Sequence, residues 1–204
     1  MDRQVMEKQM DKSLNALLKE LEQFGTANDA QTTDHSRKML NITHETGEFL
    51  ALLIRAIKAR RVLEIGTSNG YSTLWLAYAV QQLGGRIDTI ERSPFKAEMA
   101  RRNFERAGLS PLIKLHLTEA DRFFEEQSNR SYDFIFLDAN RSEYVGWWAV
   151  LQRIVTPGDL IVVDNVVSHP DELRDFIELV RTTPNCMTSI NPVGKGELII
   201  LKES

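Results

Sequence analysis

From residue 61 onward, the chain alternates between short apolar runs and segments with helical periodicity. The apolar runs read RVLEI, RIDTIE, IKLHLT, YDFIFLD and DLIVVDN, and they begin at Arg61, Arg86, Ile113, Tyr132 and Asp159. Apolar runs of this length with helices between them predict parallel strands that are covered on both faces. A last pair, MTSINPV and GELIILK, lies on either side of Gly194-Lys195 and predicts a hairpin with an antiparallel strand. We therefore expect an α/β fold that binds ligands at the carboxyl ends of its strands.

Helices are predicted between these strands and before them. They begin at Tyr71, at Ser93-Pro94, at about Ser142 and after Pro170, and an earlier helix covers about residues 43–59. Near the N-terminus, apolar residues recur at three- and four-residue steps and predict one apolar stripe on a helix, formed by Met6, Met10, Leu14, Leu17, Leu21 and Phe24. This stripe either packs against its own domain or forms a dimer contact. Residues 25–36 are predicted to be a loop.

Composition and charge narrow the classes of function. The length of 204 residues suits a single domain, with N-terminal helices over residues 1–58 and an α/β core over residues 61–204. The net charge of −4 argues against a general nucleic-acid binder, although a structured RNA held by a local basic patch stays open. Cys186 is the only cysteine, which excludes a disulfide within the chain. No apolar run approaches the roughly 18 residues of a membrane span, so we expect a cytoplasmic protein with no membrane partner.

The turn after the first strand, GTSNGYS, is the first candidate for ligand binding. It lacks the Gly-Lys-Ser/Thr of a phosphate-binding loop and the second glycine of a dinucleotide fingerprint. Glu64 suits an ammonium group, Ser72 at a helix N-terminus suits a carboxylate, and Gly66 and Gly70 allow close approach of the backbone. Glu91, at the end of the second strand, is placed to accept both hydroxyls of a ribose. An amino acid joined to a nucleoside is S-adenosylmethionine, which we expect as the cofactor.

A second group of polar residues follows two later strands. Asp138 ends the fourth apolar run, and Asp164 and Asn165 end the fifth. If these strands are parallel neighbours about 4.8 Å apart, the three side chains open on one crevice and form an all-oxygen set that suits Mg²⁺. Regular strand geometry points Asp164 and Asn165 to opposite faces, so both bind one ion only if the chain turns there. The alternative is two strand-end acids that cap the following loops.

Six segments, in order, resemble the class I S-adenosylmethionine-dependent methyltransferases, specifically the cation-dependent O-methyltransferases that include catechol and caffeoyl-CoA O-methyltransferases. Between residues 39 and 202 they read MLNITHETGEFLALLI, LEIGTSNGYS, IERSP, YDFIFLDANRSEY, LIVVDN and PVGKGELIIL. The resemblance implies a Rossmann-like fold with a seven-stranded, mostly parallel sheet and an antiparallel C-terminal strand.

The resemblance also implies roles for individual residues. It makes Asp138, Asp164 and Asn165 the ligands of Mg²⁺, or of another divalent cation such as Ca²⁺ or Mn²⁺, and it puts Asp138 near the cofactor. It further implies that the cofactor lies against Ile42, Ser68 and Ala120.

The stretch DANRSEY departs from the family pattern. Familiar members carry a lysine three residues after the first metal-binding aspartate, as the candidate base, and here Arg141 stands in its place. Arginine stays protonated and cannot be a general base. Either the metal alone acidifies the hydroxyl, or the substrate is already acidic, or another group such as His169 accepts the proton. Arg141 then either binds an anionic part of the substrate or is simply a surface residue. His169 either accepts the proton or caps the helix that follows it.

These observations favour a metal-assisted O-methyltransferase that acts on a chelating, catechol-like hydroxyl of a small aromatic molecule. The segment after Asn165 is shorter than in plant members, which argues against a large CoA ester. One alternative is a tRNA methyltransferase acting on a hydroxylated base, and another is a protein that binds S-adenosylmethionine without catalysis. We also expect a homodimer.

Overall fold

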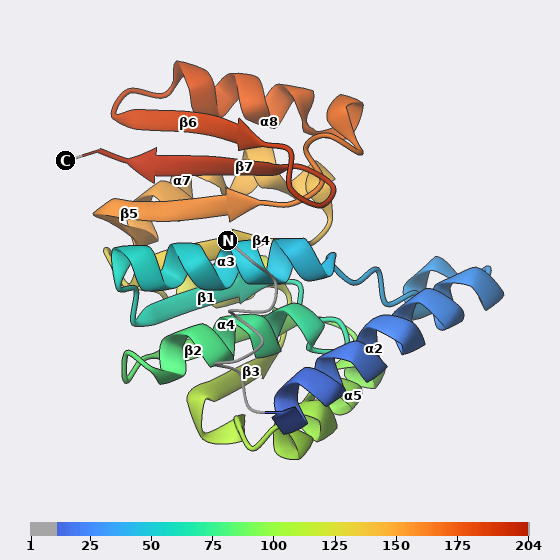
Figure 1. The fold of residues 1–204 in the computed structure, drawn as a ribbon. Coiled ribbons are helices and arrows are strands. Elements are labelled where there is room, and N and C mark those ends of the chain that lie inside the picture. Colours follow the sequence, from blue (N-terminus) through green and yellow to red (C-terminus); the bar gives the residue numbers. More distant parts are fainter. Residues whose placement is uncertain (1–11, 204) are drawn as a thin grey trace.

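Seven strands form one sheet in the computed structural model, which describes residues 12–203 (Figure 1). The order across the sheet is β3-β2-β1-β4-β5-β7-β6. The strands are β1 (Arg61–Ile65), β2 (Arg86–Glu91), β3 (Ile113–Leu117), β4 (Tyr132–Leu137), β5 (Val155–Val163), β6 (Cys186–Asn191) and β7 (Glu197–Lys202). Strands β1 to β5 run parallel, whereas β7 pairs antiparallel with both β5 and β6. The predicted sheet, including its antiparallel C-terminal strand, is confirmed.

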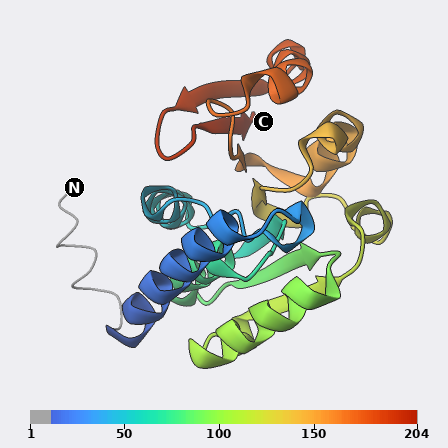
Figure 2. The same cartoon turned by 90° about the vertical axis from the view of Figure 1, so that its right-hand side faces the viewer.

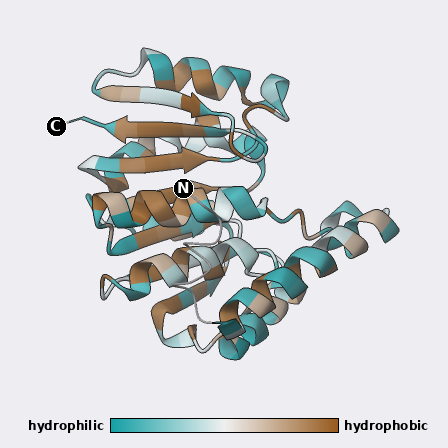
Figure 3. Ribbon diagram, in the orientation of Figure 1, coloured by the Kyte–Doolittle hydropathy of each residue, from teal (hydrophilic) through white to brown (hydrophobic). Residues whose placement is uncertain are grey.

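Helices cover both faces of this sheet. They are α2 (Lys12–Gln31), α3 (His44–Ile57), α4 (Tyr71–Gln81), α5 (Pro94–Arg106), α6 (Ala120–Glu125), α7 (Tyr144–Ile154) and α8 (Pro170–Thr182), with short 3₁₀ helices η1 (His35–Arg37), η2 (Ser110–Leu112) and η3 (Arg141–Glu143). Alternation along β4 sends Phe134 and Phe136 into a core with α2 to α5, and Ile135 and Leu137 into a core with α6 to α8. Both faces of the parallel strands are therefore apolar, and β5 and β7 appear mostly brown in Figure 3.

Helix α2 corrects one prediction. It continues through Gly25 to Gln31, where a loop was expected. Long-range contacts hold this extension. The Asn41 amide lies against Gly25 and donates to the Leu21 carbonyl at 3.0 Å, and Asp29 accepts the backbone N–H groups of residues 39 and 40. These contacts come from residues that are distant in sequence. The local composition of residues 25–36 therefore predicted a loop.

The apolar stripe on α2 is confirmed only in part. Leu14, Leu17 and Leu21 are buried in the core with α4, so this part of the helix packs on its own domain. Phe24 is 43% exposed and does not belong to the buried stripe, while Met6 and Met10 lie outside the described residues. Helix α2 lies beside α5 in both Figures 1 and 2, where Arg106 donates to Glu20 at 2.6 Å.

Side-chain caps mark the starts of two helices, α3 and α5. Thr43 accepts the backbone N–H of Thr46 at the start of α3, and Ser93 accepts that of Lys96 at the start of α5, with Pro94 in the first turn. The cap at Ser93 was predicted from the sequence. None of the helices between residues 12 and 203 combines the length and apolarity that a membrane crossing needs.

Candidate active site

A cavity of about 540 Å³ opens at the carboxyl ends of the parallel strands, the edge seen in Figure 2. It lies where the strand order reverses between β1 and β4, which is where α/β sheets of this kind bind ligands. Most of the site candidates line it: Ile42, Gly66, Ser68, Ser72, Glu91, Ala120, Asp138, Arg141, Asn165 and His169. Three candidates do not reach the cavity wall, namely Glu64, Gly70 and Asp164.

The turn after β1 packs tightly against the end of β4. Gly66 has a φ of +108°, and a Cβ at this position would lie 2.0 Å from the Asp138 carbonyl oxygen. Only glycine fits both this conformation and this approach. Two residues later, the Ser68 hydroxyl donates to the Met39 carbonyl at 2.7 Å and ties the N-terminal loop to the turn. The loop around Ile42 thereby becomes one wall of the cavity.

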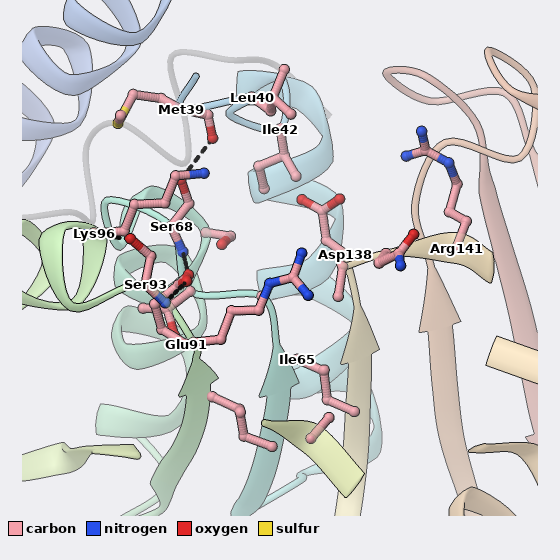
Figure 4. A pocket seen from close by; sticks show the side chains of 18 of the residues that line it. Met39, Leu40, Ile42, Ile65, Ser68, Glu91, Ser93, Lys96, Asp138 and Arg141 are labelled. Carbon is pink, nitrogen blue, oxygen red and sulfur yellow. Dashed lines mark hydrogen bonds between the residues drawn. The ribbon is translucent and has the colours of Figure 1, made fainter. Parts of the chain in front are cut away.

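Glu91 is held firmly at the end of β2. Its two carboxylate oxygens accept the backbone N–H groups of Ser68 and Ser93, each at 2.8 Å, and the residue is 8% exposed. Each carboxylate oxygen has a second lone pair, so the group can still accept two hydroxyls. Figure 4 shows this group on one side of the cavity, with Asp138 and Arg141 on the other.

Glu64 lies behind the cavity wall, under the start of α4. It is fully buried, and its carboxylate accepts the hydroxyls of Ser72 and Thr89 at 2.6 Å each, together with that of Thr73. Burial raises its pKa to about 7, although these three hydroxyls lower it. Glu64 therefore braces the start of α4 from beneath. The Ser72 hydroxyl donates its hydrogen bond to Glu64. A ligand carboxylate at this helix start would therefore be bound by the backbone N–H groups.

The acids at the ends of β4 and β5 come together as the strand order required. The strands are parallel neighbours, and Asn165 has a φ of +72°, so the chain does turn at this point. The Asn165 amide nitrogen donates to Asp138 at 3.3 Å and to Asp164 at 2.8 Å. Burial raises the pKa of Asp138 well above its usual range, and the neighbouring Asp164 raises it further.

This cluster has the chemistry of a divalent-cation site. Asp164 is buried beside the carboxyl groups of Asp138 and Glu197, and one of its oxygens receives no N–H or hydroxyl hydrogen bond, so that the protonated Glu197 is its only neighbour of this kind that can donate; this crowding of carboxyl groups is costly. A cation would relieve this crowding, once the Asn165 amide turned its oxygen toward it. Among residues 12–203 no three His, Cys, Asp or Glu side chains are arranged as a metal site, so the fit depends on this amide and on ligands from water or substrate.

Arg141 and His169 both line the same side of the cavity. The Arg141 side chain is 22% exposed, and its Nε donates to Glu172 at 2.7 Å, which leaves the two terminal nitrogens for a ligand. His169 precedes α8, and its Nδ1 lies 2.9 Å from the Ser168 hydroxyl. Its backbone N–H donates to the Asn165 carbonyl at 2.9 Å, which fixes it close to the acid cluster.

Two residues of the β6–β7 hairpin belong to this region, and sequence reasoning missed both. Lys195 lines the cavity and donates to the Asn41 carbonyl at 3.3 Å. Glu197 is fully buried and accepts the Thr46 hydroxyl at 3.1 Å; burial, together with Asp164, raises its pKa to about 10. The segment GKGE could have indicated both residues, because its two charged residues follow a hairpin turn at the edge of the sheet where ligands bind. From the sequence alone, this segment predicted only a turn.

Comparisons with known proteins agree on one family. The model of a family described as O-methyltransferase matches residues 7–176. Two curated relatives are named catechol O-methyltransferase. The one from Mycobacterium tuberculosis is 40% identical over 62% of this chain and 57% of its own length, and the one from Niastella koreensis is 35% identical over 63% and 59%. The matched region thus spans less than two thirds of either relative. An O-methyltransferase from Bacillus cereus, solved in complex with SAH, has a TM-score of 0.79 and 30% identity over 92% of this chain and 91% of its own.

Proposed function

The chain belongs to the O-methyltransferase family, and from this premise we propose that it transfers the methyl group of S-adenosylmethionine to a chelating, catechol-like hydroxyl of a small aromatic molecule, assisted by a divalent cation. One observation carries the proposal. A single cavity has a fixed carboxylate on one side, Glu91, and on the other side Asp138 and Asn165, with Asp164 directly behind the wall. The first suits a ribose, and the second suits a hard cation that chelates two neighbouring oxygens.

The cofactor half of the proposal uses the first two strands. Glu91 accepts the ribose hydroxyls, and the N-terminus of α4 binds the carboxylate of the amino-acid part. Ile42, Ser68 and Ala120 line the same cavity and would contact the remaining surface of the cofactor. The solved relative from Bacillus cereus was crystallised with SAH, the demethylated cofactor, which supports this assignment.

The acceptor half uses the ends of β4 and β5. Asp138, Asp164 and Asn165 would hold the cation, which when bound lowers the pKa of a hydroxyl and orients it. The protein then aligns that oxygen with the methyl group, and alignment can supply several kcal/mol of the barrier. Arg141 remains a cation throughout and binds the substrate instead of accepting its proton. His169, which lines the cavity beside the acid cluster, is the proposed acceptor of the proton.

A direct test is methyl transfer from labelled S-adenosylmethionine with Mg²⁺. Purified protein is offered an uncharged catechol, a flavonoid and bulk tRNA, each with and without EDTA. We expect labelled catechol or flavonoid that disappears with EDTA. Label in tRNA alone would favour the alternative of a tRNA methyltransferase, and binding of the cofactor without label in any acceptor would favour a protein without catalysis.

A further inference from the structure

The turn that carries Lys195 is held rigidly against the loop after β5. The Lys195 carbonyl accepts the backbone N–H groups of Val167 and Ser168 at 3.2 and 3.0 Å, and the Gly196 carbonyl accepts that of Val166 at 3.0 Å. This loop begins with Asp164 and Asn165, so the three bonds fix Lys195 relative to the acid cluster.

Glycine on both sides of Lys195 makes this packing possible. Gly194 and Gly196 have φ values of +58° and +94°. A Cβ at Gly194 would lie 2.1 Å from the Thr46 hydroxyl, and one at Gly196 would lie 2.3 Å from the Val167 side chain. The turn is therefore wedged between the start of α3 and the loop after β5, and its lysine projects from a fixed base.

The Lys195 side chain lies at the cavity without a matching carboxylate. It is half-buried and lines the cavity, and its ammonium donates to the Asn41 carbonyl. Within residues 12–203, no carboxylate oxygen lies within 4.0 Å of it. Because its hydrogen-bond partner, the Asn41 carbonyl, is neutral, the Lys195 ammonium is available to bind an anion that enters the cavity.

Strand order places this charge across the acceptor site from Arg141. Arg141 follows β4 and Lys195 precedes β7, and β5 lies between those two strands in the sheet. The end of β5 carries Asp164 and Asn165, so two cations flank the proposed metal ligands.

We propose that Lys195 is a specificity-determining residue that binds the carboxylate of an acidic catechol, so that the preferred acceptors are dihydroxybenzoate-like acids. The inference rests on the proposed function and adds the substrate class. A catechol that chelates the cation at Asp138 and Asp164 would extend its ring substituent along the flank of β5, where Lys195 stands. An uncharged substituent would leave this ammonium with the Asn41 carbonyl alone.

The test compares two acceptors of the same shape and different charge, 3,4-dihydroxybenzoate and 3,4-dihydroxybenzamide. Their affinity is measured by calorimetry on protein loaded with SAH and Mg²⁺, and their kcat and KM are measured with S-adenosylmethionine. We expect the wild type to bind the acid about ten-fold more tightly than the amide. Lys195→Met should remove this preference through KM for the acid, with little change in kcat or in the amide, and Lys195→Arg should restore much of it.

Lys114→Met is the matched control, because Lys114 is exposed on β3 and does not line this cavity. SAH affinity reports that each variant is folded. If Lys195→Met weakens acid and amide equally, Lys195 only holds the N-terminal loop and the inference is wrong. A wild type with no preference for the acid overturns it as well. Selective binding of the acid without any turnover would keep the anion site and reject methyl transfer as the function.

Discussion

At the scale of single residues, Glu91 tests the cofactor assignment. Both of its oxygens already accept backbone N–H groups, so the carboxylate cannot turn away from the cavity. We expect Glu91→Ala to weaken SAH binding by roughly 1–3 kcal/mol, the range for hydrogen bonds to a charged group. Calorimetry measures this, with Glu98→Ala on the exposed face of α5 as control. Unchanged affinity would remove Glu91 from the cofactor site.

Arg141 tests how the acceptor is held. Its Nε is engaged with Glu172, so a ligand meets the two terminal nitrogens. Arg141→Lys keeps the charge and loses this paired geometry, and we expect KM for the catechol acceptor to rise by about ten-fold with kcat nearly constant. Glu172→Gln keeps the guanidinium and is the matched control. If Arg141→Lys instead raises kcat on an uncharged catechol, increasingly at high pH, the wild type lacks an efficient base and the anchoring role is wrong.

At the scale of elements, the junction of β4 and β5 tests the metal proposal. Asp164 lies behind the cavity wall, where it contacts Asn165 and not the cofactor region. We expect Asp164→Ala to abolish Mg²⁺-stimulated turnover and to leave SAH affinity within about two-fold, because the cofactor binds the ends of β1 and β2. Asp159→Asn, earlier on the same strand, is the control. Full wild-type activity after exhaustive EDTA treatment would contradict the proposal.

Elements were predictable where the signal is local. The apolar runs gave the strands, and Ser93-Pro94 gave the start of α5, since both depend on neighbours in sequence. Strand β5 begins at Val155, four residues before its predicted start. Its first residue pairs with Tyr132 of β4, ahead of Pro157 and Gly158. Proline and glycine are typical of loops, so the sequence predicted that the strand begins only after them.

The candidate site was predictable to the same extent. Acids at strand ends could be placed from the parallel sheet alone. The burial of Glu64 beneath α4 could not, since it depends on hydroxyls from α4 and β2 that surround the carboxylate in space. Lys195 was missed because the strand that follows it, β7, inserts between β5 and β6, and only that insertion brings the hairpin turn to the cavity.

At the scale of the whole molecule, buried carboxyl groups make stability depend on pH. Burial raises the pKa of Glu64 to about 7 and that of Asp159 to about 6, above the values near 4 of unfolded chains. With Glu197, whose pKa is raised to about 10, the folded state therefore binds more protons than the unfolded state from about pH 4.5 to 10, and the free energy of unfolding falls as pH rises through this range. Asp133 and Asp88 have lowered pKa values and act in the opposite sense, but only at more acidic pH.

A divalent cation should oppose this loss. Asp138 has a raised pKa and lies beside Asp164, so both bind a cation best once deprotonated, and the gain should grow with pH. At a Mg²⁺ concentration near 100 times its dissociation constant we expect Tm at pH 8 to rise by roughly 5–10 °C relative to EDTA, and by much less at pH 5.5. Thermal denaturation at both pH values measures this, with Asp164→Ala expected to lose the increment. An increment that is equal at both pH values, or that survives in Asp164→Ala, would mean that the cation binds elsewhere.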